Sequence, residues 1–510
     1  MEKPQKSDFI QGEVSETDIV TGKTNSRGVV LRPQPTNDSN EPLNWSQWEK
    51  YATYLIICWF TFLAFMNSSA FTVAVSAIVK EFKKTSTEAS YLTSLQVLFM
   101  GFGALVWMPL IRIIGKRPGY LGSMLFLCVT NIWSYYSTTY ASLLASRIVG
   151  GFLTAAADAP VPSVVADLFF FHERGHVMMF FNLAISSGAF LGPLINAYIT
   201  QYLGWKWMCS VMAILSGVTF VVALLFVKET AYVVGPGGRD LEKPASEYGP
   251  KRSWLSSLGF GHGYNSQASF FGWMAQTVLL FAYPPVIIAG LICGLFIGCN
   301  IAVQLVATQT FTVAPWDWTL HSVGLLSISG FVGSLLSFFA GGRLIDYIAT
   351  RSAARHGEHP EPESRLPAML IPAVIAPMGM LTYGLVIAAQ DNWGGAAVGY
   401  GMEGFGATAA ANIVITYAVD AYRPIAGETI VVVFIIRNVI ACLISTYISK
   451  WIKQQGVKHA FGELVGVSYV ILSLSLVLFV LGRRIRALTG RFGPMAKVTA
   501  LSSLSAPIEA

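Results

Sequence analysis

Long apolar runs recur along almost the whole chain and restrict its fold more than any other feature. A helix needs about 20 mostly apolar residues to cross a hydrocarbon core about 30 Å thick. Twelve runs reach that length and predict an all-α membrane protein with twelve transmembrane helices. They cover residues 51–74, 90–111, 120–138, 142–165, 177–201, 206–227, 285–311, 321–341, 367–389, 394–417, 425–449 and 462–482.

The composition agrees with a membrane protein and excludes several other classes. Hydrophobic residues make up 54% of the 510 residues and charged residues 12%, which leaves too little polar surface for a soluble fold. The first fifty residues are polar, so we expect no cleaved signal peptide, and the first span would direct insertion. All six cysteines lie inside apolar runs without metal or redox spacing, so we expect no metal and no cofactor.

Basic residues are distributed unequally between the two sides of the predicted spans. The side of the two tails carries 25 Lys and Arg residues and the other side 7, while Arg147 and Arg437 fall inside spans. Lys and Arg collect in cytoplasmic segments, so both termini are predicted to be cytoplasmic. This topology explains the net charge of +6 better than a nucleic-acid partner does. We expect the plasma membrane, with the vacuolar membrane as an alternative.

The longest internal connection divides the chain into two halves of six spans. We predict a disordered cytoplasmic tail (1–50), an N-terminal bundle (51–227), a cytoplasmic loop (228–284), a C-terminal bundle (285–482) and a second tail (483–510). Within the loop, the apolar stretch 270–281 is expected to lie as an interfacial helix that the following prolines stop. A truncated thirteenth span is the alternative.

The segment between spans 2 and 3 reads Pro109-Leu-Ile-Arg112-Ile-Ile-Gly115-Lys116-Arg117-Pro118. It resembles the loop motif of the major facilitator superfamily, specifically its twelve-helix drug:proton antiporter group as found in fungi. Arg112 stands where the motif has an acidic residue, which puts the usual charge relay of that loop in doubt. Shorter agreements in the same order extend the resemblance over most of residues 40–482, including Glu41-Pro-Leu-Asn44-Trp45 and Lys228-Glu229-Thr230.

The second half repeats part of this loop motif. Gly342-Arg343-Leu344-Ile345-Asp346 keeps the acidic residue as Asp346, which indicates duplication of a six-helix unit. Transporters built from such repeats place their substrate between the halves.

Spans 4 and 5 carry two further matches. Span 4 contains Arg147-Ile-Val-Gly150-Gly151, similar to a motif whose intramembrane Arg is associated with proton coupling. Span 5 contains Gly188-Ala-Phe-Leu-Gly192-Pro193, which resembles the antiporter signature, although Asn196 replaces the start of its second glycine pair. Small residues four apart let helix backbones approach closely, and Pro193 disturbs the helix beyond them.

Four charged residues inside spans are the candidates for proton coupling: Arg147, Asp158, Glu403 and Arg437. A charge at the bilayer centre costs on the order of 3 kcal/mol, so each is expected to face a cavity or a partner. Arg147 and Asp158 share a helix face but lie roughly 16 Å apart, too far to pair. Glu403 and Arg437 could neutralise each other, either for coupling or as a purely structural pair.

Asp158 and Glu403 are the candidate proton carriers, because burial can raise a carboxyl pKa toward neutrality. For Asp158 an alternative is that span 4 ends near Pro160 and Pro162, which would leave the carboxylate in a cytoplasmic vestibule.

Polar residues inside the spans are candidates to line a substrate cavity. Their amides could bond a substrate, although such groups more often bond neighbouring helices. The six candidates are Asn67, Gln96, Asn182, Asn300, Gln304 and Asn412.

We therefore predict a monomeric secondary transporter, not an enzyme, whose partners are a small-molecule substrate, protons and the lipid bilayer. The sequence lacks a phosphate-binding Gly-rich loop, which leaves an ion gradient as the energy source. The resemblance implies proton-driven export of a small amphipathic organic compound. A proton-coupled importer of a nutrient or polyamine and a non-transporting receptor are the alternatives.

Overall fold

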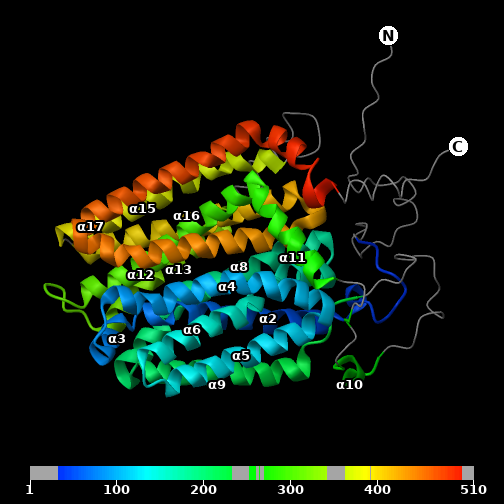
Figure 1. Cartoon of the computed structure of the whole chain (residues 1–510), viewed down its shortest axis with the longest axis horizontal. Coiled ribbons are helices and arrows are strands. Elements are labelled where there is room, and N and C mark those ends of the chain that lie inside the picture. The colour runs from blue at the N-terminus through cyan, green and yellow to red at the C-terminus, as the bar shows by residue number, and fades with distance from the viewer. Residues whose placement is uncertain are drawn as a thin grey trace, which may run out of the picture.

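The computed structural model describes residues 33–232, 252–259, 263–264, 269–341, 362–390 and 392–496. These residues form long helices that run side by side, without strands (Figure 1). We call the end of the bundle at which α2 begins and α17 finishes the tail end. The opposite end carries α3 and the connection between α12 and α13.

Helix-start and turn signals explain where the helices of the first half begin and end. Capping boxes start α2 at Ser46 with Glu49 and α4 at Thr85 with Glu88, each satisfying free N–H groups. Gly115, with φ of 99°, turns the chain from α4 into α5 in a conformation that favours glycine. The helices are α2 Gln47–Ser69, α3 Val75–Phe82, α4 Ser86–Ile114, α5 Lys116–Tyr136, α6 Tyr140–Thr154, α7 Val161–Leu168, α8 Phe171–Leu203 and α9 Trp205–Phe226.

The second half contains the longest helical segment, α17, which breaks at Gly456 (φ 82°) into two arms. In Figure 1 the orange and the red arm of α17 meet at the end of the bundle that carries α3, and both run back toward the tail end. Two short helices, α10 and α11, precede this half. The bounds are α10 Trp254–Ser257, α11 Phe270–Leu279, α12 Pro284–Phe311, α13 Leu320–Leu336 with a π-helical turn Ser337–Gly341, α15 Leu370–Ala389, α16 Trp393–Ala421 and α17 Ala426–Thr489.

Nine helices among the described residues are long and apolar enough to cross a membrane. That set counts α17 once, although the predicted spans 425–449 and 462–482 fall on its two arms. It leaves out α5 and α16, which coincide with the predicted spans 120–138 and 394–417. The described chain is therefore an all-helical membrane protein, and the number of twelve spans stays a prediction.

Two helix pairs make the most extensive contacts between the first half (α2–α9) and the second half (α12–α17). One is α4 against the first arm of α17, and the other is α8 against α13. Glycines bring the backbones together there: a Cβ added at Gly101 would lie 2.9 Å from Cβ of Asn438, and one at Gly324 2.8 Å from Cβ of Ala197. The centre of the protein lies between these seams.

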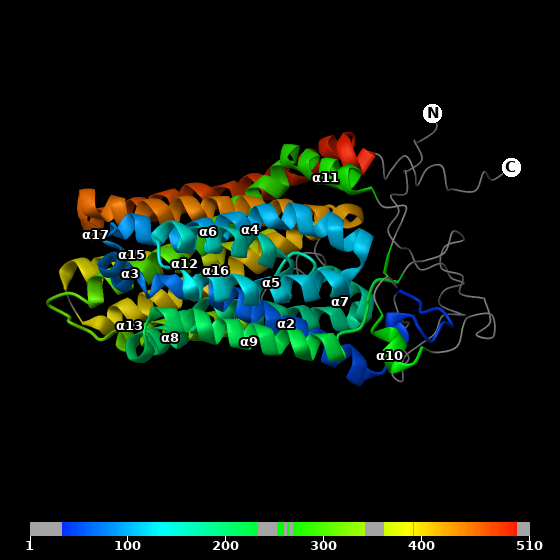
Figure 2. The same ribbon diagram turned by 60° about the horizontal axis from the view of Figure 1, so that its bottom comes forward.

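The stretch 270–281 forms α11 and a following 3-10 turn, Leu280–Ala282. With ten residues, α11 is much shorter than the roughly 20 that a span needs, which argues against a thirteenth span. It packs against both α4 and α17 at the tail end, where Figure 2 shows it beside the last turns of α17.

Residues 33–46 differ from the predicted disordered tail of residues 1–50. They include a 3-10 helix, Pro42–Asn44, with Glu41 buried. The Glu41 carboxylate accepts hydrogen bonds from the backbone N and the hydroxyl of Thr36, both at 2.7 Å. The Asn44 amide donates to the carbonyl of Asp38 at 2.7 Å. These side chains bond the local backbone, and the 3-10 helix contacts α7 of the first half.

Candidate functional site

A buried ion pair joins the two halves near the middle of the bundle. The Arg437 guanidinium on α17 donates from Nη2 to Oδ2 of Asp158, and the two side chains are only 5% and 4% exposed. Arg437 also donates from Nε to Oδ1 of Asn438 at 3.2 Å and stacks on the ring of Phe434. The predicted partnership of Arg437 with Glu403 is therefore wrong: the partner lies in the other half.

Asp158 reaches this position because span 4 is a broken helix. α6 ends at Thr154, a 3-10 turn follows, and α7 begins only at Val161. Pro160 lacks a backbone N–H and precedes the new helix. The carbonyl of Ala157, freed by the break, accepts from the Thr61 hydroxyl at 2.7 Å. Asp158 is 3% exposed, which argues against the vestibule alternative.

Arg147 is held by neutral groups instead of a carboxylate. It donates to Oδ1 of Asn67 at 3.1 Å, to the Asn67 carbonyl at 2.5 Å and to Oε1 of Gln96. Its guanidinium carbon lies 4.6 Å from the ring centre of Phe71. Arg147 and Asp158 do not pair, as their spacing predicts. Asn67 and Gln96 therefore bond a neighbouring helix, which is the alternative to lining a substrate cavity.

Glu403, near the middle of α16, is fully buried at 0% exposure. Neither carboxyl oxygen has a hydrogen-bond partner in the described part of the chain. An unpaired buried carboxylate is costly, whereas the protonated acid is neutral. This environment favours the protonated form of Glu403 in the described conformation.

A polar junction links the halves close to Glu403. Its centre is the Gln304 amide on α12, which donates to the Ala189 carbonyl at 3.0 Å, to Oδ1 of Asn300 at 2.7 Å and to the Tyr400 hydroxyl at 3.2 Å. Its oxygen accepts from the Thr72 hydroxyl at 3.2 Å. Thr72 and Ala189 belong to the first half, so Gln304 bonds both halves at once.

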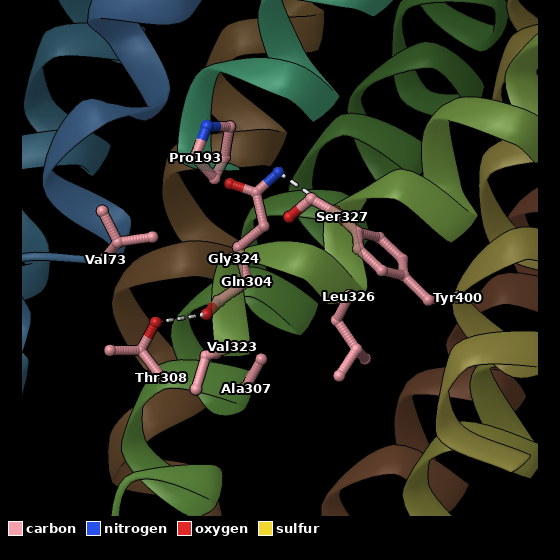
Figure 3. Close-up of a pocket in the computed structure, with 10 residues that line it drawn as sticks. All are labelled: Val73, Pro193, Gln304, Ala307, Thr308, Val323, Gly324, Leu326, Ser327 and Tyr400. Carbon is pink, nitrogen blue, oxygen red and sulfur yellow. Dashed lines mark hydrogen bonds between the residues drawn. The ribbon is translucent and has the colours of Figure 1, made fainter. Parts of the chain in front are cut away.

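A small cavity lies at this junction (Figure 3). Its volume is about 10 Å³, room for about one water molecule. The lining includes polar groups of Gln304, Thr308, Ser327 and Tyr400. The full set is Val73, Pro193, Gln304, Ala307, Thr308, Val323, Gly324, Leu326, Ser327 and Tyr400.

Of the six predicted cavity residues, Gln304 lines this cavity and Asn300 contacts the lining residue Tyr400. The Asn182 amide instead donates to Oδ1 of Asn412 at 2.9 Å, which joins α8 to α16 toward the tail end. Sequence reasoning missed Tyr400. Its spacing of three residues before Glu403, which puts both on one helix face, was the available signal.

Comparison with known proteins identifies the family. The sequence profile of the Major Facilitator Superfamily matches residues 57–446. The chain belongs to the major facilitator superfamily. It is therefore an integral, multi-pass membrane transporter and not an enzyme.

Similar proteins of this superfamily carry different names. Protein HOL1 of Saccharomyces cerevisiae is 24% identical, with 92% of each chain covered. MFS-type transporter penM of Penicillium rubens is 27% identical over 88% of each chain. Efflux pump FUBT of Fusarium oxysporum is 22% identical over 89% of this chain and 76% of its own. The crystal structure of a D-xylose-proton symporter shares the fold, with a TM-score of 0.58 and 16% identity over 84% of this chain and 97% of its own.

The superfamily loop motif between α4 and α5 is locked by Glu229. The Glu229 carboxylate accepts from the backbone N of Lys116 at 2.9 Å and of Arg117 at 3.1 Å, and so caps α5. A Cβ at Gly115 would lie 2.4 Å from Oε2 of Glu229, so a larger residue there would displace the Glu229 carboxylate. Burial raises the pKa of Glu229 above its ordinary value, although these hydrogen bonds oppose the shift. The Lys116 ammonium pairs with Asp167.

Arg112, the residue that departs from the superfamily motif, has its own acidic partner. Its Nη1 lies 3.1 Å from Oε1 of Glu428 at the start of α17. Its guanidinium carbon lies 3.7 Å above the ring centre of Trp273 on α11. Arg112 thus links α4 to the second half and to the connecting helix. The matching motif of the second half, with Asp346, lies outside the described residues.

The glycines of the superfamily-like spans sit at close helix contacts within the first half. A Cβ at Gly151 would lie 2.2 Å from the Gln96 carbonyl oxygen, and one at Gly188 2.5 Å from that of Phe62. α6 therefore packs on α4, and α8 on α2, at distances that only glycine permits. A Cβ added at Gly150 would lie 3.2 Å from Oγ1 of Thr130, and one at Gly192 2.7 Å from Oγ of Ser69. Pro193 lines the cavity.

Proposed function

We propose that this protein couples proton movement to the export of a small amphipathic organic compound by alternating access. The observation that carries the proposal is the buried Asp158–Arg437 pair between the halves. Protonation of Asp158 removes its charge and leaves Arg437 without its counter-ion. Breaking one partner of a buried pair costs about 3–5 kcal/mol, enough to change which arrangement of the halves is preferred.

Contacts between the halves at both ends support an occluded conformation between two open ones. Toward the tail end they include Arg112 with Glu428 and Asn182 with Asn412. At the opposite end, Gln201 on α8 accepts from the backbone N of Leu320 at 3.0 Å, and the Tyr198 and His321 rings lie 5.3 Å apart. Rocking of the halves would break one set at a time and widen the central cavity.

In this proposal the tail end faces the cytoplasm and the protein resides in the plasma membrane. The excess of Lys and Arg in the connections at that end supports the orientation. One proton moving down the membrane potential supplies about 2.3 kcal/mol per 100 mV. One or two titrating carboxyl groups would therefore suffice to drive export.

The direction of transport rests on resemblance. The span-5 sequence and relatives named efflux pumps support export. Uptake of a nutrient or polyamine is the alternative, because protonation of Asp158 between the two halves can drive transport in either direction.

Retention in cells with and without the protein tests the proposal. A panel of organic cations, antifungal compounds and fungal metabolites would be measured with and without a proton uncoupler. Lower retention that the uncoupler abolishes is the expected result. Higher retention that the uncoupler abolishes would establish uptake and reverse the proposed direction. Transport that the uncoupler leaves unchanged would contradict proton coupling.

A further inference from the structure

The second half holds a buried acid without a resident counter-ion. Glu403 is fully enclosed: the Asn300 amide on α12 is a polar neighbour of its carboxyl group, but no described group lies within hydrogen-bond geometry of either oxygen. Helix backbones close around it: a Cβ at Gly379 on α15 would lie 2.9 Å from the backbone N of Glu403, and one at Gly404 2.3 Å from the Gly330 carbonyl oxygen on α13. An ionisable side chain buried inside a span costs free energy, so we expect Glu403 to bind a proton or a charged ligand.

The groups that face Glu403 supply no positive charge. The titratable neighbours are Tyr400 on its own helix and Cys299 on α12, with Tyr383 of α15 behind Tyr400. α13 contributes glycine backbone at Gly330. The two basic residues nearest the middle of the described spans are engaged elsewhere, Arg437 with Asp158 and Arg147 with amides.

Tyr400 connects this acid to the central cavity. It lies one helical turn before Glu403 and lines the cavity. Its ring centre is 5.7 Å from that of Phe190 on α8 and 6.5 Å from that of Tyr383. Aromatic faces next to an acid form the kind of site that binds organic cations.

We propose that the transported compound carries a positive charge and that its cationic group takes Glu403 as counter-ion beside Tyr400, displacing the carboxyl proton. This inference rests on the proposed transporter function and names its substrate class. The exchange balances: the neutral acid and the cation give a carboxylate–cation pair and one free proton. Because proton and substrate exclude each other at one group, outward substrate movement is linked to inward proton movement.

A direct test uses the purified full-length protein in detergent with quaternary ammonium and phosphonium ions of increasing size. These probes are permanently charged, so any proton released comes from the protein. Each is compared with a neutral carbon isostere, and proton release is followed with an indicator dye in weak buffer. We expect about one proton released per cation bound, and apparent affinity rising about tenfold per pH unit while Glu403 is protonated.

The variants identify the group. E403Q should abolish cation-induced proton release, E403D should retain part of it, and E463Q, an exposed carboxyl at the opposite end, should match the wild type. Thermal unfolding close to that of the wild type would show that E403Q is folded. If it is not, the pH dependence of binding to E403D decides in its place.

Three outcomes would overturn the inference: no probe binds, neutral isosteres bind as well as cations, or E403Q releases protons normally. None of these affects uncoupler-sensitive transport in cells, so the proposed function would stand. Proton–cation exchange in detergent without transport in cells would instead contradict the proposed function and leave the Glu403 site intact.

Discussion

Arg112 at the end of α4 and Glu428 at the start of α17 form a 3.1 Å ion pair that joins the two halves at the tail end. In the superfamily loop motif that residues 109–118 resemble, an acidic residue stands at the position of Arg112. Here the charge is reversed and an acid lies opposite. The Arg112–Glu428 pair thus holds the two halves together at this loop.

Reversing both charges tests this pair. R112E or E428R alone should reduce transport several-fold, because each places like charges together between the halves. The double variant R112E/E428R should recover at least half of the lost activity, since residues in contact couple by about 0.5–3 kcal/mol. Initial rates of transport in proteoliposomes give the measurement. K84A, which removes a partly exposed pair within the first half, should change little. Strictly additive losses would exclude the coupling.

Replacing Asp158 tests the central pair. D158N should abolish uphill transport while leaving exchange of substrate across the membrane largely intact, because the amide cannot carry the proton. E403Q should also abolish uphill transport, but unlike D158N it should weaken exchange as well, because the cationic substrate loses its proposed counter-ion. Accumulation and exchange would be measured in proteoliposomes with matched protein levels. If both variants still concentrate substrate, the wrong carboxyl groups have been identified.

The Asp158–Arg437 pair also makes a prediction about stability. D158A should lower the melting temperature more than the double change D158A/R437M does. The single variant leaves a buried guanidinium without its partner, which costs about 3–5 kcal/mol, whereas the double variant removes both charges. Melting curves of the purified proteins give the comparison. An equal or larger loss in the double variant would contradict this account.

Gly115 and Gly175 form a matched pair of glycine positions. G115A should destabilise the protein, because φ of 99° with ψ of 161° is a region essentially restricted to glycine and costs an alanine about 1–3 kcal/mol, and its Cβ would collide with Glu229. G175A lies in a helix with nothing within 4 Å of the added Cβ, so it should be neutral or slightly stabilising. Melting temperatures of the two variants decide. Equal effects would show that the loop does not need its glycine.

The raised pKa of Glu229 predicts a pH dependence with a defined sign. Because the folded pKa lies above the ordinary value of 4.5, the folded state binds the proton more tightly than the unfolded state. This contribution to stability is fully present below pH 4.5 and is lost as pH rises through the raised pKa. The melting temperature of the wild type relative to E229Q should therefore fall as pH rises through that range. A difference that grows with pH would show the opposite shift.

The sequence by itself determined the class of fold and identified the charged residues inside the spans. Apolar runs of sufficient length leave helices as the way to cross the bilayer, because every backbone group must be bonded within the segment. The cost of an intramembrane charge singled out Arg147, Asp158, Glu403 and Arg437 from one sequence. Spacing along one helix also showed that Arg147 and Asp158 cannot pair.

Only the tertiary structure decided which of these residues meet. Helical periodicity fixes angles within one helix, but the rotation of each helix against its neighbours depends on how side chains and glycines pack. That packing brings Arg437 to Asp158, 279 positions away, and leaves Glu403 alone. It also gives Arg112 a partner that no local pattern indicates. Contacts between distant segments follow from the packing of the whole bundle, which residue spacing does not contain.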